Sequence, residues 1–443
     1  MSKPEPTVAL IREGLSRIAD GCGVVLFALL APLVIFSGRQ SFETEALAVG
    51  VIGAAAAWLS PTGVRRVPMA MLAYVGLALL SAIVHEWPVV AAMAEPDWWL
   101  VIAPAQHLLV MAVFVAGAAH LLRTPRRISV FVVFLAVAIA VIATQTLFDR
   151  ISTNFVYAEG GSLSLPSVSQ WGGMHQVGLV LVIGFPLVFA VSCSSTSRLR
   201  ILAGAVLGGG LLIVAALNGS RSGIGTMVIS ALAMGGLSFR LGRRTRWAPR
   251  YYLLALLVLG VGVWFGAAQI ERSRAPLSSI SSGRWEIWSG AAAIAYDHPL
   301  LGVGPGNYNA TMIDGGYAGR YLPHYARRSL NPPDPAALIG TEQAHNLLLH
   351  VAAETGIAGA LSLLVFWIGL MTGCWRSLAR AHLPLLSMAL LAALGAFLLR
   401  CMYDNFLDVV MANERVRVLA WMLFGAALAL QRLVPAARQE HQA

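Results

Sequence analysis

Long apolar runs of roughly 17–25 residues, separated by short polar segments, recur along most of the chain. A run of this length is what a helix needs to cross the hydrocarbon core of a bilayer. The pattern predicts an all-α fold, a polytopic transmembrane helical bundle of about twelve spans. The spans are expected at about 19–38, 45–60, 67–84, 104–122, 128–147, 174–193, 201–217, 224–239, 251–269, 346–372, 383–400 and 416–431.

Composition also indicates a membrane protein and excludes a soluble enzyme. Of the 443 residues, 58% are hydrophobic and 12% are charged, whereas soluble domains carry about 25% charged residues. The mean hydropathy of +0.72 agrees. Lys3 is the only lysine, and the arginines lie between apolar runs, which argues against a basic arm for nucleic acid. The four cysteines show no metal or redox spacing.

The basic residues predict the orientation of the bundle. With the N-terminus inside, the two terminal segments and alternate loops carry 19 Lys and Arg against four Asp and Glu. The opposite face carries 12 arginines against 16 carboxylates. Because cytoplasmic loops are enriched in Lys and Arg, we expect both termini in the cytoplasm.

One predicted outer loop, residues 270–345, is far longer than the others and divides nine spans in 1–269 from three spans and a tail in 346–443. Loops of this length are commonly functional. Within the loop, a helical pattern that begins at Arg284 predicts a short helix on the bilayer surface. The face that would contact the bilayer consists of Trp285, Trp288, Ala292 and Ala295. The string 297–308 is rich in turn residues and excludes a helix.

His345 is the strongest candidate for catalysis. It stands eleven residues, about three helical turns, before Gly356, and Gly359 follows on nearly the same line. Leu349 and Ala352 fill the turns between. We expect one continuous helix with a stripe of small residues, against which a neighbour packs closely and which aims His345 at the outer mouth of the bundle. In the first turn the helix dipole would keep the ring neutral, as a general base requires; the alternative is an interfacial polar anchor.

Two arginines are candidates for binding phosphate on the same face. Arg221, preceded by Ser220, stands at the start of the eighth span, where free N–H groups and the helix dipole favour an anion. Arg284 has the equivalent position on the surface helix. Each has a plainer interpretation, Arg221 as a snorkelling residue in a simple turn and Arg284 as a solvated charge. Together with His345 they indicate an outward-facing site for a lipid phosphate or pyrophosphate.

Four further residues are weaker candidates for substrate contacts. They are Asn346, beside the histidine, Arg327 and Arg328 on the large loop, and Asp404 after the eleventh span. For Asp404, an exposed helix cap is an equally good interpretation.

Glu354 and His350 share one face of the tenth span, and for them we favour a structural polar pair over a proton relay. The sequence shows no acidic cluster of the kind that holds a catalytic metal ion. We therefore expect no metal and no other cofactor.

The string His345-Asn346-x9-Gly356-x-x-Gly359 resembles the signature of bacterial O-antigen ligases, within the larger family of O-antigen ligases and polymerases. Two more segments are similar to the core of this family: Ser220-Arg221-Ser222-Gly223, and the run from Arg284 through Trp288 to His298-Pro299-Leu300-Leu301-Gly302-Val303-Gly304. The resemblance covers about residues 200–365, and the arrangement of spans around one large outer loop is also similar.

The resemblance implies a GT-C-like integral membrane glycosyltransferase in a bacterial inner membrane. Such ligases transfer O-antigen polysaccharide from undecaprenyl pyrophosphate to the lipid A–core oligosaccharide on the periplasmic face. It further implies that His345 activates or orients the acceptor hydroxyl, and that Arg221 and Arg284 hold the pyrophosphate. Direct attack at the anomeric carbon would invert its configuration without a metal.

Three alternatives remain. A polymerase of the same family would use the same arginines to lengthen a lipid-linked glycan, and a protein O-oligosaccharyltransferase would glycosylate serine or threonine. A transporter of lipid-linked sugars would perform no chemistry, but it would be expected to show more intramembrane charges and two matching halves.

Overall fold

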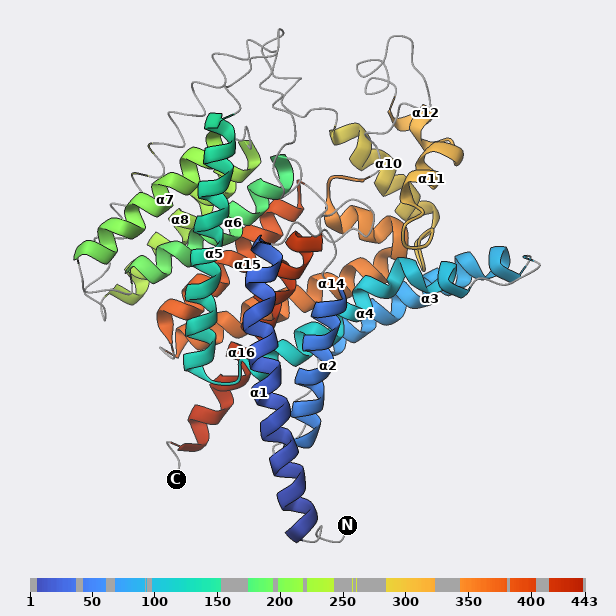
Figure 1. Ribbon diagram of the computed structural model, residues 1–443. Helices are drawn as coiled ribbons and strands as arrows, with labels where there is room; N and C mark the ends of the chain where they lie inside the picture. Colours follow the sequence, from blue (N-terminus) through green and yellow to red (C-terminus); the bar gives the residue numbers. More distant parts are fainter. Residues whose placement is uncertain are drawn as a thin grey trace.

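The computed structural model describes residues 6–36, 43–60, 68–91, 93, 98–152, 174–193, 198–217, 221–242, 257, 260, 284–322, 343–380, 383–403 and 414–440. Every regular element in these ranges is an α-helix (Figure 1). The helices are α1 Pro6–Phe36, α2 Glu43–Leu59, α3 Met69–Ala91, α4 Trp98–Leu121, α5 Pro125–Ser152, α6 Met174–Cys193, α7 Arg198–Leu217, α8 Arg221–Gly242, α10 Arg284–Asp297, α11 Tyr308–Asp314, α12 Tyr317–Tyr321, α14 Leu347–Ala379, α15 Pro384–Cys401 and α16 Glu414–Glu440.

For the described residues, the prediction of an all-helical protein with several helices apolar enough to span a membrane is confirmed. Four helical segments are long and apolar enough to cross a membrane: Met69–Pro88, Pro125–Gln145, Leu347–Ala379 and Pro384–Cys401. Shorter apolar stretches lie within α2, α4, α6, α7 and α8. The predicted span at 251–269 lies outside the described residues except for 257 and 260. The number twelve and the orientation of the spans therefore stay predictions.

Small residues let the helices of the main bundle approach closely. Gly50 and Gly53 on α2 face Gly117 on α4, and a Cβ atom at Gly53 would lie 2.7 Å from the Cα atom of Gly117. Such contacts between backbones are a common means of packing helices in membranes. They fix the position of α4, which also packs on α3 and α16.

Helices α10, α11 and α12 have a second apolar core of their own, next to the start of α14 (Figure 1). The face of α10 that enters this core is made of Ile287, Ala291 and Ile294. The predicted bilayer face is therefore wrong for Ala295, and its contact with a bilayer stays a prediction. Trp285 is 71% exposed, but Ala295 is buried because the second core lies beneath it.

A charged cluster ties α1 to the turn between α4 and α5. Asp20 on α1 is buried, and both of its carboxylate oxygens accept hydrogen bonds from Arg127, at 3.1 and 2.9 Å. Arg123 donates to the same carboxylate at 3.1 Å. Arginines that the sequence offers only as markers of orientation therefore also hold the fold together.

We expect Asp20→Asn to lower the free energy of unfolding by about 2 kcal/mol, because charge-assisted hydrogen bonds to a buried carboxylate are lost. Partial solvation of both guanidinium groups keeps the loss below that of a fully buried pair. Denaturation of the detergent-purified protein by heat or SDS measures this loss in the free energy of unfolding. Glu13→Gln is the control, because its pair with Arg17 is exposed and should contribute less than about 0.5 kcal/mol. Equal losses in the two variants would contradict a structural role for Asp20.

Candidate active site

Helix α14 is broken at Gly356, which has φ 78° and ψ 171°. This backbone conformation is essentially restricted to glycine. The prediction of one continuous helix from His345 past Gly359 is therefore wrong. The periodicity of the side chains continues through the break, and for that reason the sequence does not reveal it.

Residues 298–307, which we call the inserted turn, fill the break with their own backbone. The amides of Val303 and Gly304 donate to the carbonyl oxygens of Ala353 and Glu354, at 2.9 and 3.0 Å. The amide of Ile357 donates in the other direction, to the carbonyl oxygen of Pro299 at 2.9 Å. Hydrogen bonds that a regular helix would make internally are thus made to a segment about fifty residues earlier in the chain.

Two glycines make this contact possible. A Cβ atom at Gly302 would collide with the backbone of Ala353 and Glu354, and one at Gly356 with the carbonyl of Leu300. Gly302 also has a positive φ of 65°. Gly356 is therefore needed for its conformation and for its closeness to the inserted turn, rather than as part of a stripe for a neighbouring helix. Gly359 lies against the side chain of Thr355 in its own helix.

Helix α3 holds the inserted turn from the other side. The hydroxyl of Ser81 lies 2.5 Å from the carbonyl oxygen of Leu301 and 3.0 Å from that of Glu354, so it bridges the turn and α14. The side-chain amide of Asn307 donates to the carboxylate of Glu86 at 2.7 Å. The turn is thereby fixed between two helices that cross the bundle.

A buried polar cluster lies directly below the turn. Glu354 accepts a hydrogen bond from the amide of Gly306 at 2.8 Å, and its carboxylate lies 3.3 Å from Nε2 of His350. The ring of Tyr308 packs on His350 with centroids 4.9 Å apart. Burial, followed by the nearby Glu354 carboxylate, raises the pKa of Tyr308, so the phenol stays neutral. These contacts agree with a structural pairing of Glu354 and His350.

His345 lies just outside α14, in a strained and well-fixed conformation. Its φ is +46°, a left-handed conformation that is unusual for a residue other than glycine. Ala344 before it is buried in the second core, and Asn346 after it caps the helix by accepting from the amide of Leu349 at 3.1 Å. The histidine therefore precedes the first helical turn instead of standing in it. A strained residue that its surroundings hold in place is characteristic of functional sites.

Helix α10 reaches the same corner of the molecule. The indole nitrogen of Trp288 donates to the carbonyl oxygen of His345 at 3.4 Å, and its ring lies 6.3 Å from that of Tyr403 at the end of α15. Arg284, the first residue of α10, is half-buried one turn before Trp288, about 6 Å along the helix axis. The structure thus brings His345 and the helix end that carries Arg284 to one place.

Two buried arginines, of which Arg400 lies next to this corner, entered the sequence analysis only as part of the charge count for orientation. Arg400, in the last turn of α15, is completely buried and stands three residues before Tyr403. Arg417, near the start of α16, is 3% exposed. Charged residues inside membrane helices are costly and usually functional. Their position within apolar helices was the signal in the sequence that could have identified them.

The remaining predicted site residues lie at the limit of the described structure or beyond it. Arg221 is the first residue of α8, but its side chain is outside the described part. Outside the described residues altogether are Ser220, Arg327, Arg328 and Asp404. Among the described residues, no group of three His, Cys, Asp or Glu side chains could hold a metal ion.

We expect Gly356→Ala and Gly302→Ala each to lower the free energy of unfolding by about 3 kcal/mol or more, because strain and a backbone collision act together. Gly369→Ala on the same helix is the control, since nothing lies within 4 Å of the new methyl group. It should be neutral or slightly stabilising. Thermal unfolding in detergent compares the three, and a Gly356→Ala protein as stable as Gly369→Ala would contradict the inserted turn.

The chain was compared with known proteins, and the result concerns the region that contains the inserted turn and His345. No curated protein matches the chain. Residues 203–364 match the family model described as O-antigen ligase. The matched region contains α8, α10, the inserted turn, His345 and the break in α14. Residues 203–364 of this chain are therefore an O-antigen ligase family domain.

Proposed function

We propose that the protein is an O-antigen ligase of the bacterial inner membrane. It would transfer O-antigen polysaccharide from undecaprenyl pyrophosphate to the lipid A–core oligosaccharide, with its active site facing the periplasm. The family match supports the transfer of a lipid-linked glycan by a membrane enzyme. The choice of lipid A–core as acceptor is our further step, and it rests on the His-Asn-x9-Gly-x-x-Gly motif.

One observation carries the proposal: Trp288 of α10 contacts the backbone of the strained His345. That contact joins a helix N-terminus that carries Arg284, a group suited to a pyrophosphate, to an imidazole suited to an acceptor hydroxyl. Buried Arg400 near the same corner is a further source of positive charge. An anion and a nucleophile held side by side are what a glycosyl transfer from a lipid pyrophosphate requires.

The proposed step is a single displacement. The acceptor oxygen attacks the anomeric carbon as its proton passes to His345, and the bond from that carbon to the pyrophosphate oxygen breaks. The bonding electrons leave with the pyrophosphate, whose growing charge Arg221 and Arg284 stabilise. Attack from the face opposite the leaving group inverts the anomeric configuration, and in this proposal no metal takes part.

The first test reconstitutes the purified protein in liposomes with undecaprenyl-pyrophosphate glycan and lipid A–core, in the presence of a chelator. We expect transfer with inversion, and a loss of 10²- to 10⁴-fold in rate for His345→Ala because proton transfer is removed. His345→Gln separates the roles, since it can still hydrogen-bond but accepts no proton.

Offering other acceptors in the same liposomes separates the alternatives. Lengthening of the donor glycan alone would make the protein a polymerase, and transfer to a serine or threonine peptide would make it a protein glycosyltransferase. Full activity of His345→Ala would remove the general base from the mechanism. Loss of transfer in chelator would show that a metal is required.

The second test concerns the arginines. We expect Arg284→Ala and Arg221→Ala to weaken use of the donor at least tenfold, and lysine to restore it poorly because an ammonium group cannot bind phosphate with two parallel hydrogen bonds. Arg320→Ala on α12 is the control, as an exposed arginine of the same outer region. Steady-state kinetics with varied donor give the comparison, and equal effects at all three positions would indicate general electrostatics instead of a site.

A further inference from the structure

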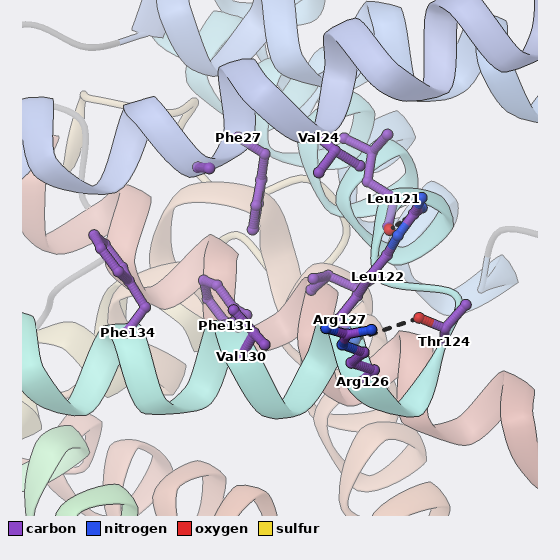
Figure 2. Close-up of a pocket in the computed structure, with 11 residues that line it drawn as sticks. Val24, Phe27, Leu121, Leu122, Thr124, Arg126, Arg127, Val130, Phe131 and Phe134 are labelled. Atoms are coloured by element: carbon purple, nitrogen blue, oxygen red, sulfur yellow. Dashed lines mark hydrogen bonds between the residues drawn. The ribbon is translucent and has the colours of Figure 1, made fainter.

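A groove runs between α1 and α5, far along the chain from the candidate active site (Figure 2). Its volume is about 390 Å³. We call it the α1–α5 groove, and its lining consists of Val24, Phe27, Ala28, Leu121, Leu122, Thr124, Arg126, Arg127, Val130, Phe131 and Phe134. The rings of Phe27 and Phe131, 5.1 Å apart, lie along it. Most of the groove is therefore apolar.

One end of the groove carries positive charge. Arg126 and Arg127 stand there with Thr124, next to the turn that joins α4 to α5 (Figure 2). Arg127 and Arg123 share the single carboxylate of Asp20, which leaves this cluster with an excess of one positive charge. Arg126 is exposed and adds another. The charged end is thus cationic even after its ion pairs are counted.

The length and the lining of the groove suit one acyl chain with a polar group at its end. From Thr124 to Phe134 it follows ten residues of α5, about 15 Å. Val130, which is 62% exposed, and Phe134, which is 39% exposed, lie in a segment apolar enough to cross a membrane. An occupant would therefore lie along a helix in the hydrocarbon region, with its polar end at the arginines.

Two other cavities lined by described residues provide a contrast. One of about 720 Å³ lies between α8, α14 and α15, and one of about 310 Å³ lies between α5, α6 and α15. Neither has a charged residue in its lining. The combination of an acyl-sized apolar groove with a cationic end distinguishes the α1–α5 groove from both.

We propose that the α1–α5 groove binds an anionic glycerophospholipid. One acyl chain lies along Phe27, Phe131 and Phe134, and the phosphate lies at Arg126, where charge complementarity selects it. Basic groups near a membrane surface attract anionic lipids with about 1 kcal/mol each. Because the bound lipid contacts α1 and α5 together, it also strengthens the junction that Asp20 forms.

Native mass spectrometry of the full-length protein in detergent tests the proposal, with phosphatidylglycerol and phosphatidylethanolamine of the same acyl chains as probes. We expect tighter binding of phosphatidylglycerol, and a loss of about fivefold for Arg126→Ala. Arg376→Ala removes an exposed arginine at the end of α14 and should leave the binding unchanged. Equal loss in both variants, or equal binding of the two lipids, would overturn the proposal.

A second pair of variants tests the apolar part of the groove. Ala28→Trp fills the groove and should abolish binding of phosphatidylglycerol, although all the arginines remain. Val25→Trp places the same ring on α1 outside the lining, at a residue that is 57% exposed, and should bind as the unaltered protein does. Unchanged binding by Ala28→Trp, in a protein with unchanged thermal unfolding, would show that the lipid lies elsewhere.

Discussion

The arrangement of α10, α11 and α12 on α14 depends on a contact between backbones, the insertion of residues 298–307 into the break of α14. Three hydrogen bonds between the inserted turn and α14 replace bonds that a continuous helix would make internally. The segment of α14 before the break packs on the second core through Leu349 and Ala353. His345, with its positive φ, directly follows Ala344 of that core.

Most helices could be predicted from the sequence, but the break of α14 at Gly356 could not. Periodicity and length predicted most of the described helices, including α10 and the turns after it, because both depend on local pattern. At Gly356 the same periodicity favoured a continuous helix. In the sequence, a glycine that is needed for its positive φ looks the same as a glycine that is needed for close helix packing. The inserted turn that contacts Gly356 lies about fifty residues earlier in the chain. Only the structure separates the two cases.

The role of an arginine is also ambiguous in the sequence, because the same residue can mark orientation or make a structural contact. Positive residues on one side of a bundle predict orientation whether or not they make contacts, so counting them could not show that Arg123 and Arg127 share Asp20. Nor could it show that Arg400 is buried beside the predicted site. Burial and pairing depend on how helices distant in sequence meet. For the same reason the lining of the α1–α5 groove could not be predicted from either helix alone.

The inserted turn is held mainly by atoms that every amino acid possesses. Amides and carbonyls of residues 299–304 and 353–357 make the contact with α14, whereas the side chain of Asn307 binds Glu86 on α3. Space for a Cβ atom is missing at Gly302, Gly304 and Gly356. Side chains of the turn that contact neither α3 nor the second core can therefore change residue by residue, while the backbone contact with α14 stays the same.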